Sequence, residues 1–141
     1  MPDLPHKIFH LMYDNDPFSI WLGIELVDIK EGYCCLKMRV KQLMLNGFDI
    51  AHGGIAYSLC DSALAFASNS YGIKCVSIET SISHLKQIKE NDEITATANE
   101  IYKGNKTAVY HVNVINQSDE LVAVFKGTVY RTGKPWIEIN L

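Results

Sequence analysis

One acidic residue stands inside the most apolar stretch of the chain. From Ile55 to Ala67 the residues are apolar or small at almost every position, and Asp61 is the only charged one. The stretch lacks the single apolar stripe of a surface helix, so it predicts a helix that is buried on all sides. Ionised carboxylates are rarely buried without a partner or a task. Asp61 is therefore a candidate general base or nucleophile, with a structural carboxylate held by backbone hydrogen bonds as the alternative.

The start of this helix is the second chemical feature. The helix opens with Gly53 and Gly54, and no Ser, Thr, Asp or Asn precedes them as a cap. Backbone N–H groups are then expected to remain free at the positive end of the helix dipole, where a developing negative charge is stabilised. The Gly53 N–H is the candidate oxyanion donor, although a glycine here also permits a tight turn into the helix.

The distance between these two groups sets a condition on any shared chemistry. At a rise of ~1.5 Å per residue, Asp61 lies roughly 12 Å along the helix axis from Gly53. A reacting carbonyl must lie about 3 Å from both its oxyanion donors and the attacking group. One chain cannot meet this condition, so a shared site requires the helix of a second copy to run antiparallel beside the first. A two-fold dimer provides this arrangement at two sites.

The composition indicates a single domain without a nucleic-acid, metal or membrane partner. The chain has 141 residues, of which 48% are hydrophobic, and this suits one core and one domain over residues 1–141. The net charge is −3 and the basic residues are scattered, so we expect no binding to nucleic acid or a membrane surface. The four cysteines and five histidines lack the spacing of a metal site. With no secretion signal or membrane span expected, these features favour a cytoplasmic protein with reduced thiols.

The remaining pattern predicts an α+β fold. We expect two short helices within residues 5–22, strands at 23–28 and 33–40, and a long helix from Gly53 to about Ser70 that Tyr71-Gly72 stops. Four further alternating runs, with turn residues between them, predict an antiparallel meander over residues 75–85, 93–101, 106–115 and 121–131. A largely antiparallel sheet must then wrap around the one long helix, with a peripheral tail from residue 133.

Three residues carry a resemblance to a known family. Asn46, Gly53 and Asp61 follow one another at offsets of seven and eight residues, and His52-Gly53-Gly54 marks the helix start. In this frame the sequence resembles the hotdog-fold acyl-CoA thioesterases, and among them the phenylacetic-acid-degradation type, over nearly the whole chain. The resemblance implies a hotdog fold and the hydrolysis of aryl- or aryl-acetyl-CoA thioesters. It also implies that Asn46, Gly53 and Asp61 are the catalytic residues.

The same resemblance implies an assembly and a substrate. It implies a homotetramer built from two dimers with shared active sites, and no cofactor other than the coenzyme A of the substrate. The chain departs from the family after its third strand, where relatives commonly carry Leu-Arg-Pro and this chain has Leu85-Lys86-Gln87. Lys86 is the basic residue at this place, and we count it among the substrate-binding candidates.

Three further residues near the helix start are substrate-binding candidates, namely His52, Gly54 and Tyr57. For His52, a backbone hydrogen bond that fixes the loop is favoured over an acid–base role, because no base of the family falls on this position. Tyr57 can line an aromatic acyl pocket, and core packing explains it equally well.

Two alternative functions are compatible with the sequence. A hotdog acyl-CoA hydratase or dehydratase needs a histidine paired with a carboxylate across the double bond, and the usual His-Phe-Pro-Gly-like start of its helix is missing here. A non-catalytic acyl-CoA-binding protein is the second alternative. A sensor of that kind normally carries a DNA-binding module, and no segment of this chain is expected to form one.

Overall fold

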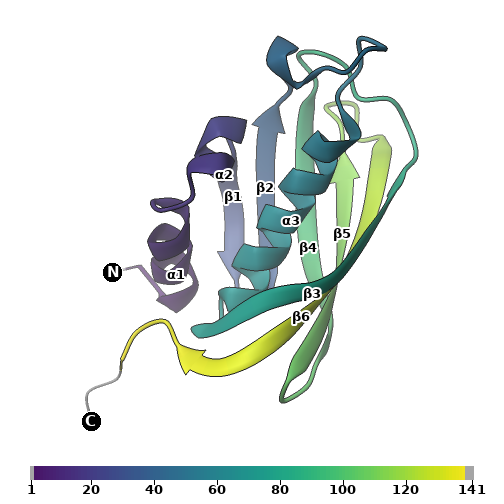
Figure 1. Cartoon of the computed structure of the whole chain (residues 1–141). Helices are drawn as coiled ribbons and strands as arrows, with labels where there is room; N and C mark the ends of the chain where they lie inside the picture. Colours follow the sequence, from purple (N-terminus) through teal and green to yellow (C-terminus); the bar gives the residue numbers. More distant parts are fainter. Residues whose placement is uncertain (1, 139–141) are drawn as a thin grey trace.

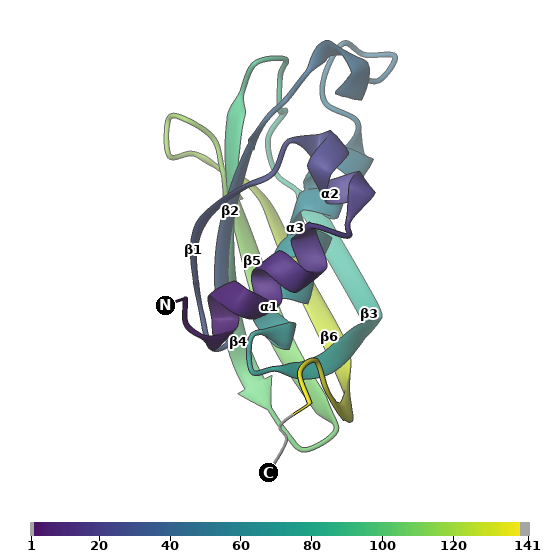
Figure 2. The ribbon, with the colours of Figure 1, turned by 90° about the vertical axis from the view of Figure 1, so that its left-hand side faces the viewer.

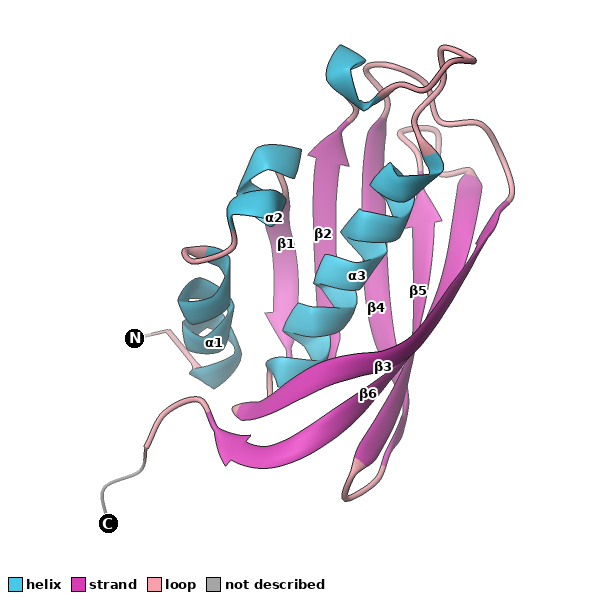
Figure 3. Ribbon diagram, viewed as in Figure 1, coloured by secondary structure: helices cyan, strands magenta, loops and turns pink. Residues whose placement is uncertain are grey.

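The computed structural model describes residues 2–138, which form a curved antiparallel sheet around one long helix (Figures 1 and 3). The six strands are ordered β1-β2-β4-β5-β6-β3, and every neighbouring pair is antiparallel. The predicted α+β architecture is therefore confirmed. The elements are α1 (Leu4–Tyr13), α2 (Pro17–Leu22), β1 (Glu25–Lys30), β2 (Tyr33–Arg39), the 3-10 turn η1 (Gln42–Met44), α3 (Gly53–Asn69), β3 (Ile73–His84), β4 (Glu93–Lys103), β5 (Thr107–Ile115) and β6 (Leu121–Pro135).

The order of the strands differs from the predicted meander. β3 pairs with β6 at one edge of the sheet, and β4 lies between β2 and β5. Residues 89–92 therefore belong to a crossover between β3 and β4 and do not form a hairpin turn. The backbones of Val40, Asn91 and Asp92 hold this crossover to the end of β2 through two hydrogen bonds of 2.8 and 2.9 Å. The two later links are hairpin turns as predicted. The predicted meander is therefore correct for β4, β5 and β6 and wrong for β3, because turn residues do not specify which strand becomes the neighbour.

The sheet covers α3 on one side only. Leu59, Ala63 and Phe66 are among the helix residues that lie buried against the sheet and the N-terminal helices. Along the opposite side runs a stripe that the protomer leaves partly or fully accessible, and we call it the open face of α3. It consists of Gly54, Tyr57, Ser58, Asp61 and Ala65. The expectation of a helix buried on all sides was wrong for this face, because its small residues give the sequence the composition of a buried helix.

The two short N-terminal helices are confirmed, and both begin at aspartate caps. Asp3 and Asp16 accept hydrogen bonds from backbone N–H groups in the first turn, and a proline follows close behind each cap. The helices lie beside α3 at the β1 end of the sheet (Figure 2). Phe9 of α1 packs edge-on against Phe66 of α3, with 4.8 Å between the ring centroids. Within residues 2–138, no helix has both the length and the apolar character needed to cross a membrane.

Asn69 joins two other segments to the end of α3. This residue is only 1% exposed. The Oδ1 atom accepts hydrogen bonds from the Cys75 N–H (2.9 Å) and from the Trp136 Nε1–H (2.8 Å), and Nδ2 donates to the Ala65 carbonyl (2.8 Å). One buried amide thus connects the helix end, the start of β3 and the segment after β6.

The predicted peripheral tail was wrong for the residues that the structure describes. β6 continues to Pro135, and the Trp136 N–H donates to the carbonyl of Gly72 (2.9 Å). Residues 139–141, the last part of that predicted tail, lie outside the described residues.

We expect Asn69→Ala to lower the free energy of unfolding by about 2–4 kcal/mol, because it leaves the Cys75 and Trp136 donors without an acceptor in or near the core. Urea denaturation measures this as a lower midpoint at an unchanged slope. Asn99→Ala is the matched control, since Asn99 is exposed on β4, and it should change the value by less than about 0.5 kcal/mol. Equal effects of the two variants would contradict the role of Asn69.

Candidate active site

A histidine caps the first turn of α3. The His52 Nδ1 accepts a hydrogen bond from the Gly54 N–H (2.9 Å), and the His52 carbonyl accepts one from the Ile55 N–H (2.9 Å). The expected uncapped start was therefore wrong, while His52 makes the loop-fixing backbone hydrogen bond that was favoured for it. The Gly53 N–H has no hydrogen-bond partner within the described chain. It is the free donor at the positive end of the helix dipole.

The loop before α3 places Asn46 at this same end of the helix. The Asn46 N–H donates to the Ile50 carbonyl (2.8 Å), and Oδ1 accepts from the Phe48 N–H (2.9 Å), which fixes the side chain in an Asx turn. The His52 N–H closes the loop by donating to the Met44 carbonyl (2.8 Å). The Nδ2 group of Asn46 makes no hydrogen bond among residues 2–138, so it is available to a substrate or a water molecule.

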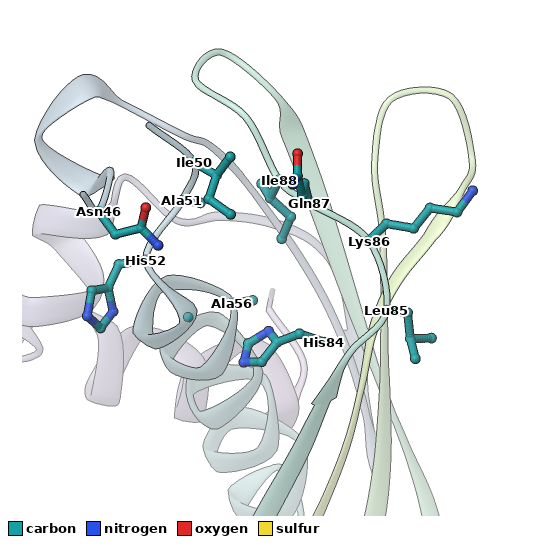
Figure 4. Close-up of a pocket in the computed structure, with 11 residues that line it drawn as sticks. Asn46, Ile50, Ala51, His52, Ala56, His84, Leu85, Lys86, Gln87 and Ile88 are labelled. Atoms are coloured by element: carbon teal, nitrogen blue, oxygen red, sulfur yellow. The ribbon is translucent and has the colours of Figure 1, made fainter. Parts of the chain in front are cut away.

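A cavity of about 320 Å³ opens beside this helix end (Figure 4). It brings together four of the residues that the sequence predicted, Asn46, His52, Gly53 and Lys86. The strand end and crossover after it, residues 84–88, form the opposite wall. Its remaining lining is Ile50, Ala51 and Ala56. The cavity therefore has a mostly apolar wall with a few polar groups at the helix start, as in many small-molecule sites.

The ammonium group of Lys86 points away from this cavity (Figure 4). It forms an ion pair with the carboxylate of Glu120, which precedes β6. The hydrogen bond from Lys86 holds the pKa of Glu120 below its usual range. A coenzyme A phosphate that binds Lys86 must compete with Glu120, so this residue contributes less free positive charge than the sequence suggests.

His84 lies at the rim of the cavity, and the sequence pattern does not single it out. It ends β3, and its ring packs on Gly53, with Nε2 at 3.2 Å from the position that a Cβ atom of residue 53 would occupy. Only the observed strand order brings the end of β3 to the start of α3. The alternation of residues along 75–85 contains no signal of this contact.

Asp61 lies on the open face of α3, and it does not line the cavity at the helix start. The residue is accessible in the protomer, although its carboxyl group is partly covered, and it makes no hydrogen bond within residues 2–138. It borders a smaller cavity of about 230 Å³, together with Ser68, Cys75 and Ser77. The expectation that Asp61 is buried was wrong for the single chain. Ser77 is a further polar neighbour that the sequence pattern does not single out.

The surroundings of Asp61 strengthen it as a base. Partial burial raises the pKa of the Asp61 carboxyl, and the negative charge of Asp16 raises it further. Asp16 is held in place because it accepts a hydrogen bond from the Ser19 hydroxyl (2.6 Å). That hydroxyl in turn lies 2.8 Å from the hydroxyl of Ser62, the neighbour of Asp61 on α3. A carboxylate with a raised pKa accepts a proton from water more readily.

The cysteine thiols are not activated nucleophiles. Burial raises the pKa of Cys60 to about 12 and that of Cys34 well above its usual value, so neither thiol is activated as a thiolate. All four cysteines are free thiols. In the described part of the chain, no three His, Cys, Asp or Glu side chains are grouped to hold a metal ion.

A curved antiparallel sheet around one central helix is the hotdog architecture, and in this chain the helix carries a free N–H at its start and a carboxylate about two turns along. The profile of the Thioesterase superfamily matches residues 48–123, which is more than half of the chain. The chain belongs to this superfamily and is a thioester hydrolase, as the sequence resemblance predicted.

Individual relatives support this assignment. A putative esterase of Archaeoglobus fulgidus is 43% identical over 91% of this chain and 83% of the relative. The acyl-coenzyme A thioesterase PaaI of Escherichia coli is 39% identical over 92% of this chain and 95% of its own. The structure of that protein, from the phenylacetic acid degradation operon, superimposes with a TM-score of 0.91 at 37% identity over 94% of this chain and 99% of its own. A hypothetical thioesterase of Streptococcus pneumoniae, solved with coenzyme A, gives a TM-score of 0.83 at 28% identity, covering 88% of this chain and 98% of that chain. The predicted resemblance to the phenylacetic-acid-degradation type is confirmed.

We expect Asp16→Asn to lower the pKa of Asp61, because it removes a nearby negative charge that disfavours the ionised carboxylate. Asparagine also caps helices, so α2 should remain intact. Carboxyl carbon NMR during a pH titration measures the change, with the Asp61 resonance assigned by its loss in Asp61→Asn. The control Asp14→Asn should leave the pKa of Asp61 unchanged. An unchanged titration of Asp61 in Asp16→Asn would contradict the coupling.

Proposed function

We propose that this protein hydrolyses acyl-CoA thioesters with small aromatic acyl groups, of the aryl or aryl-acetyl class, to the free acid and coenzyme A. In the proposed site, Asp61 of one subunit faces the Gly53 N–H of its partner. The observation that carries the proposal is that α3 presents a free N–H at its start and an unpaired carboxylate on its open face. Their separation along one helix, roughly 12 Å, requires two chains to complete one site.

The relatives and the open face support this substrate class. The Escherichia coli relative is named an acyl-coenzyme A thioesterase and comes from a phenylacetic acid degradation operon, and the Streptococcus pneumoniae structure contains coenzyme A. On the open face, the Tyr57 ring packs edge-on against Phe125, with 5.5 Å between centroids, and its hydroxyl is hydrogen-bonded to Thr80. A fixed aromatic side chain beside the site suits a flat acyl group.

The proposed reaction uses Asp61 and Gly53 at the same carbonyl group. Water attacks the thioester carbon while Asp61 takes its proton, or Asp61 attacks directly and water hydrolyses the resulting mixed anhydride. In both routes negative charge develops on the carbonyl oxygen, where the Gly53 N–H stabilises it, and the C–S bond breaks to release the coenzyme A thiolate. The Asn46 amide positions the water or the carbonyl, while His52 and Gly54 maintain the turn that presents Gly53.

Two surfaces of the protomer support the proposed dimer. β3 is an edge strand, and its residues Val76 and Ile78 are 56% and 59% exposed. The open face of α3 is the second surface. A copy related by a two-fold axis covers both of these surfaces. The family resemblance further implies that two such dimers form a homotetramer.

We expect Asp61→Asn to reduce kcat for phenylacetyl-CoA by about 10²–10⁴-fold, because the amide cannot accept the proton or attack the thioester. Coloured thiol reagents measure the release of coenzyme A. Asp14→Asn changes an exposed aspartate at the end of α1 and serves as the control. Activity of Asp61→Asn within a few fold of the parent would overturn the proposal.

Mixing two inactive variants tests whether the site is shared. Gly53→Pro removes the N–H, and proline is tolerated at the first position of a helix when an extended residue such as His52 (φ −56°, ψ 138°) precedes it. Gly53→Ala keeps the N–H and measures the cost of the added Cβ alone. Random assortment of Asp61→Asn and Gly53→Pro chains makes about half of the dimers mixed, each with one intact site, so about a quarter of the parent activity should return. A mixture that stays inactive would contradict a shared site.

The same assay separates the alternative functions. Steady thiol release from phenylacetyl-CoA supports hydrolysis. Loss of the enoyl absorbance of an unsaturated acyl-CoA without thiol release would indicate a hydratase. Binding without either change would indicate a non-catalytic acyl-CoA-binding protein. A panel of aromatic and straight-chain acyl-CoA esters then tests the proposed acyl class by kcat/KM.

A further inference from the structure

The His84 side chain is directed at the start of α3 (Figure 4). Its ring covers the side-chain position of Gly53, since Nε2, Cε1 and Cδ2 lie 3.2, 3.5 and 4.0 Å from where a Cβ atom of residue 53 would be. The contact is tight at Nε2, so a Cβ atom at position 53 would force the ring to shift by a few tenths of an ångström. The His84 ring can therefore occupy this position because residue 53 has no Cβ atom.

The backbone on both sides of His84 is held by β6. His84 pairs with Ala123 in the sheet register, and the next two N–H groups, of Leu85 and Lys86, both donate to the Val122 carbonyl (2.8 and 3.2 Å). The ring therefore extends from a paired strand end, and such elements hold a functional group more accurately than a free loop.

Several polar groups around His84 are already hydrogen-bonded or ion-paired. The His52 Nδ1 accepts from the Gly54 N–H, the Asn46 Oδ1 accepts from the Phe48 N–H, and the Lys86 ammonium pairs with Glu120. The His84 ring makes no hydrogen bond to any residue from 2 to 138. Five groups that line the cavity remain available as donors to a ligand: the Gly53 N–H, the amide groups of Asn46 and Gln87, the Nε2–H of His52 and the His84 ring. Of the side chains among them, the His84 ring is the one packed on Gly53.

We propose that His84 is a catalytic residue that donates a second hydrogen bond from Nε2 to the carbonyl oxygen activated by the Gly53 N–H. The inference rests on the proposed function of this site. An oxygen that accepts the Gly53 N–H lies beside the residue on which the His84 ring is packed. As the carbonyl carbon becomes tetrahedral, the charge on this oxygen grows, so a second fixed donor stabilises the transition state more than the bound substrate. The bond strengthens during the attack and is released when the C–S bond breaks.

The test compares two replacements of His84 in the full-length protein. His84→Phe keeps a ring on Gly53 without a donor, and His84→Gln keeps a donor without the ring. We expect His84→Phe to lower kcat for phenylacetyl-CoA about 10²-fold, with KM changed by no more than about threefold, and His84→Gln to recover most of the loss. His111→Phe is the matched control, because His111 is exposed on β5 and does not line this cavity. It should leave kcat unchanged.

A second measurement uses Gly53→Ala, whose Cβ atom would shift the His84 ring by a few tenths of an ångström. This variant should lower kcat in the parent protein and have little further effect in a His84→Ala background, where no ring remains to be displaced. Full kcat in His84→Phe, a loss confined to KM, or His84→Gln as impaired as His84→Phe would overturn the role of His84. Asp61→Asn is assayed in parallel. If it is inactive while His84→Phe is fully active, only this inference fails. If it retains activity, the proposed function fails.

Discussion

The contact between α3 and the curved sheet is the interaction on which the rest of the structure depends. Leu59 and Phe66 are almost fully buried, and burial of such a side chain contributes about 1.5–3 kcal/mol. The contact is close enough to restrict the sheet itself. A Cβ atom on Gly127 of β6 would lie 2.5 Å from the Leu64 side chain, so only glycine fits there without rearrangement. A single sheet covers one side of a helix about 10 Å wide, and the opposite side is the open face that carries Asp61.

The same strand reaches both chemical regions of the helix. β3 begins beside the end of α3, where Asn69 binds its Cys75 N–H, and it ends at His84 beside the helix start. Ser77 borders the Asp61 cavity from the first half of this strand. A shift in the register of β3 against β6 would therefore move the surroundings of the carboxylate and of the Gly53 N–H together.

Local sequence patterns predicted the helices and strands, but they did not predict the contacts between distant segments. The predicted end of the long helix at Tyr71-Gly72 was informative, since Gly72 has a φ of +87°, which glycine adopts readily. The family resemblance at Asn46, Gly53 and Asp61 named the candidate residues, and the structure brings Asn46 and Gly53 to one cavity while Asp61 borders another. The place of β3 at the sheet edge depends on pairing between distant segments. The histidine cap was missed because His52 is not among the usual N-cap residues. The open face was missed because small residues occur both on a helix that its own chain buries and on one that a second chain covers.

The charges on α3 explain why a second chain suits this arrangement. Covering the open face removes water from Asp61 and adds to the burial and the Asp16 charge that already raise its pKa. Without a compensating positive charge, this rise in pKa would favour the protonated carboxylic acid, which cannot act as a base. In the proposed dimer the positive helix start of the partner, with its free Gly53 N–H, faces the carboxylate and favours the ionised form. The proton affinity of Asp61 then depends on assembly, because the group that completes the site also keeps its base ionised.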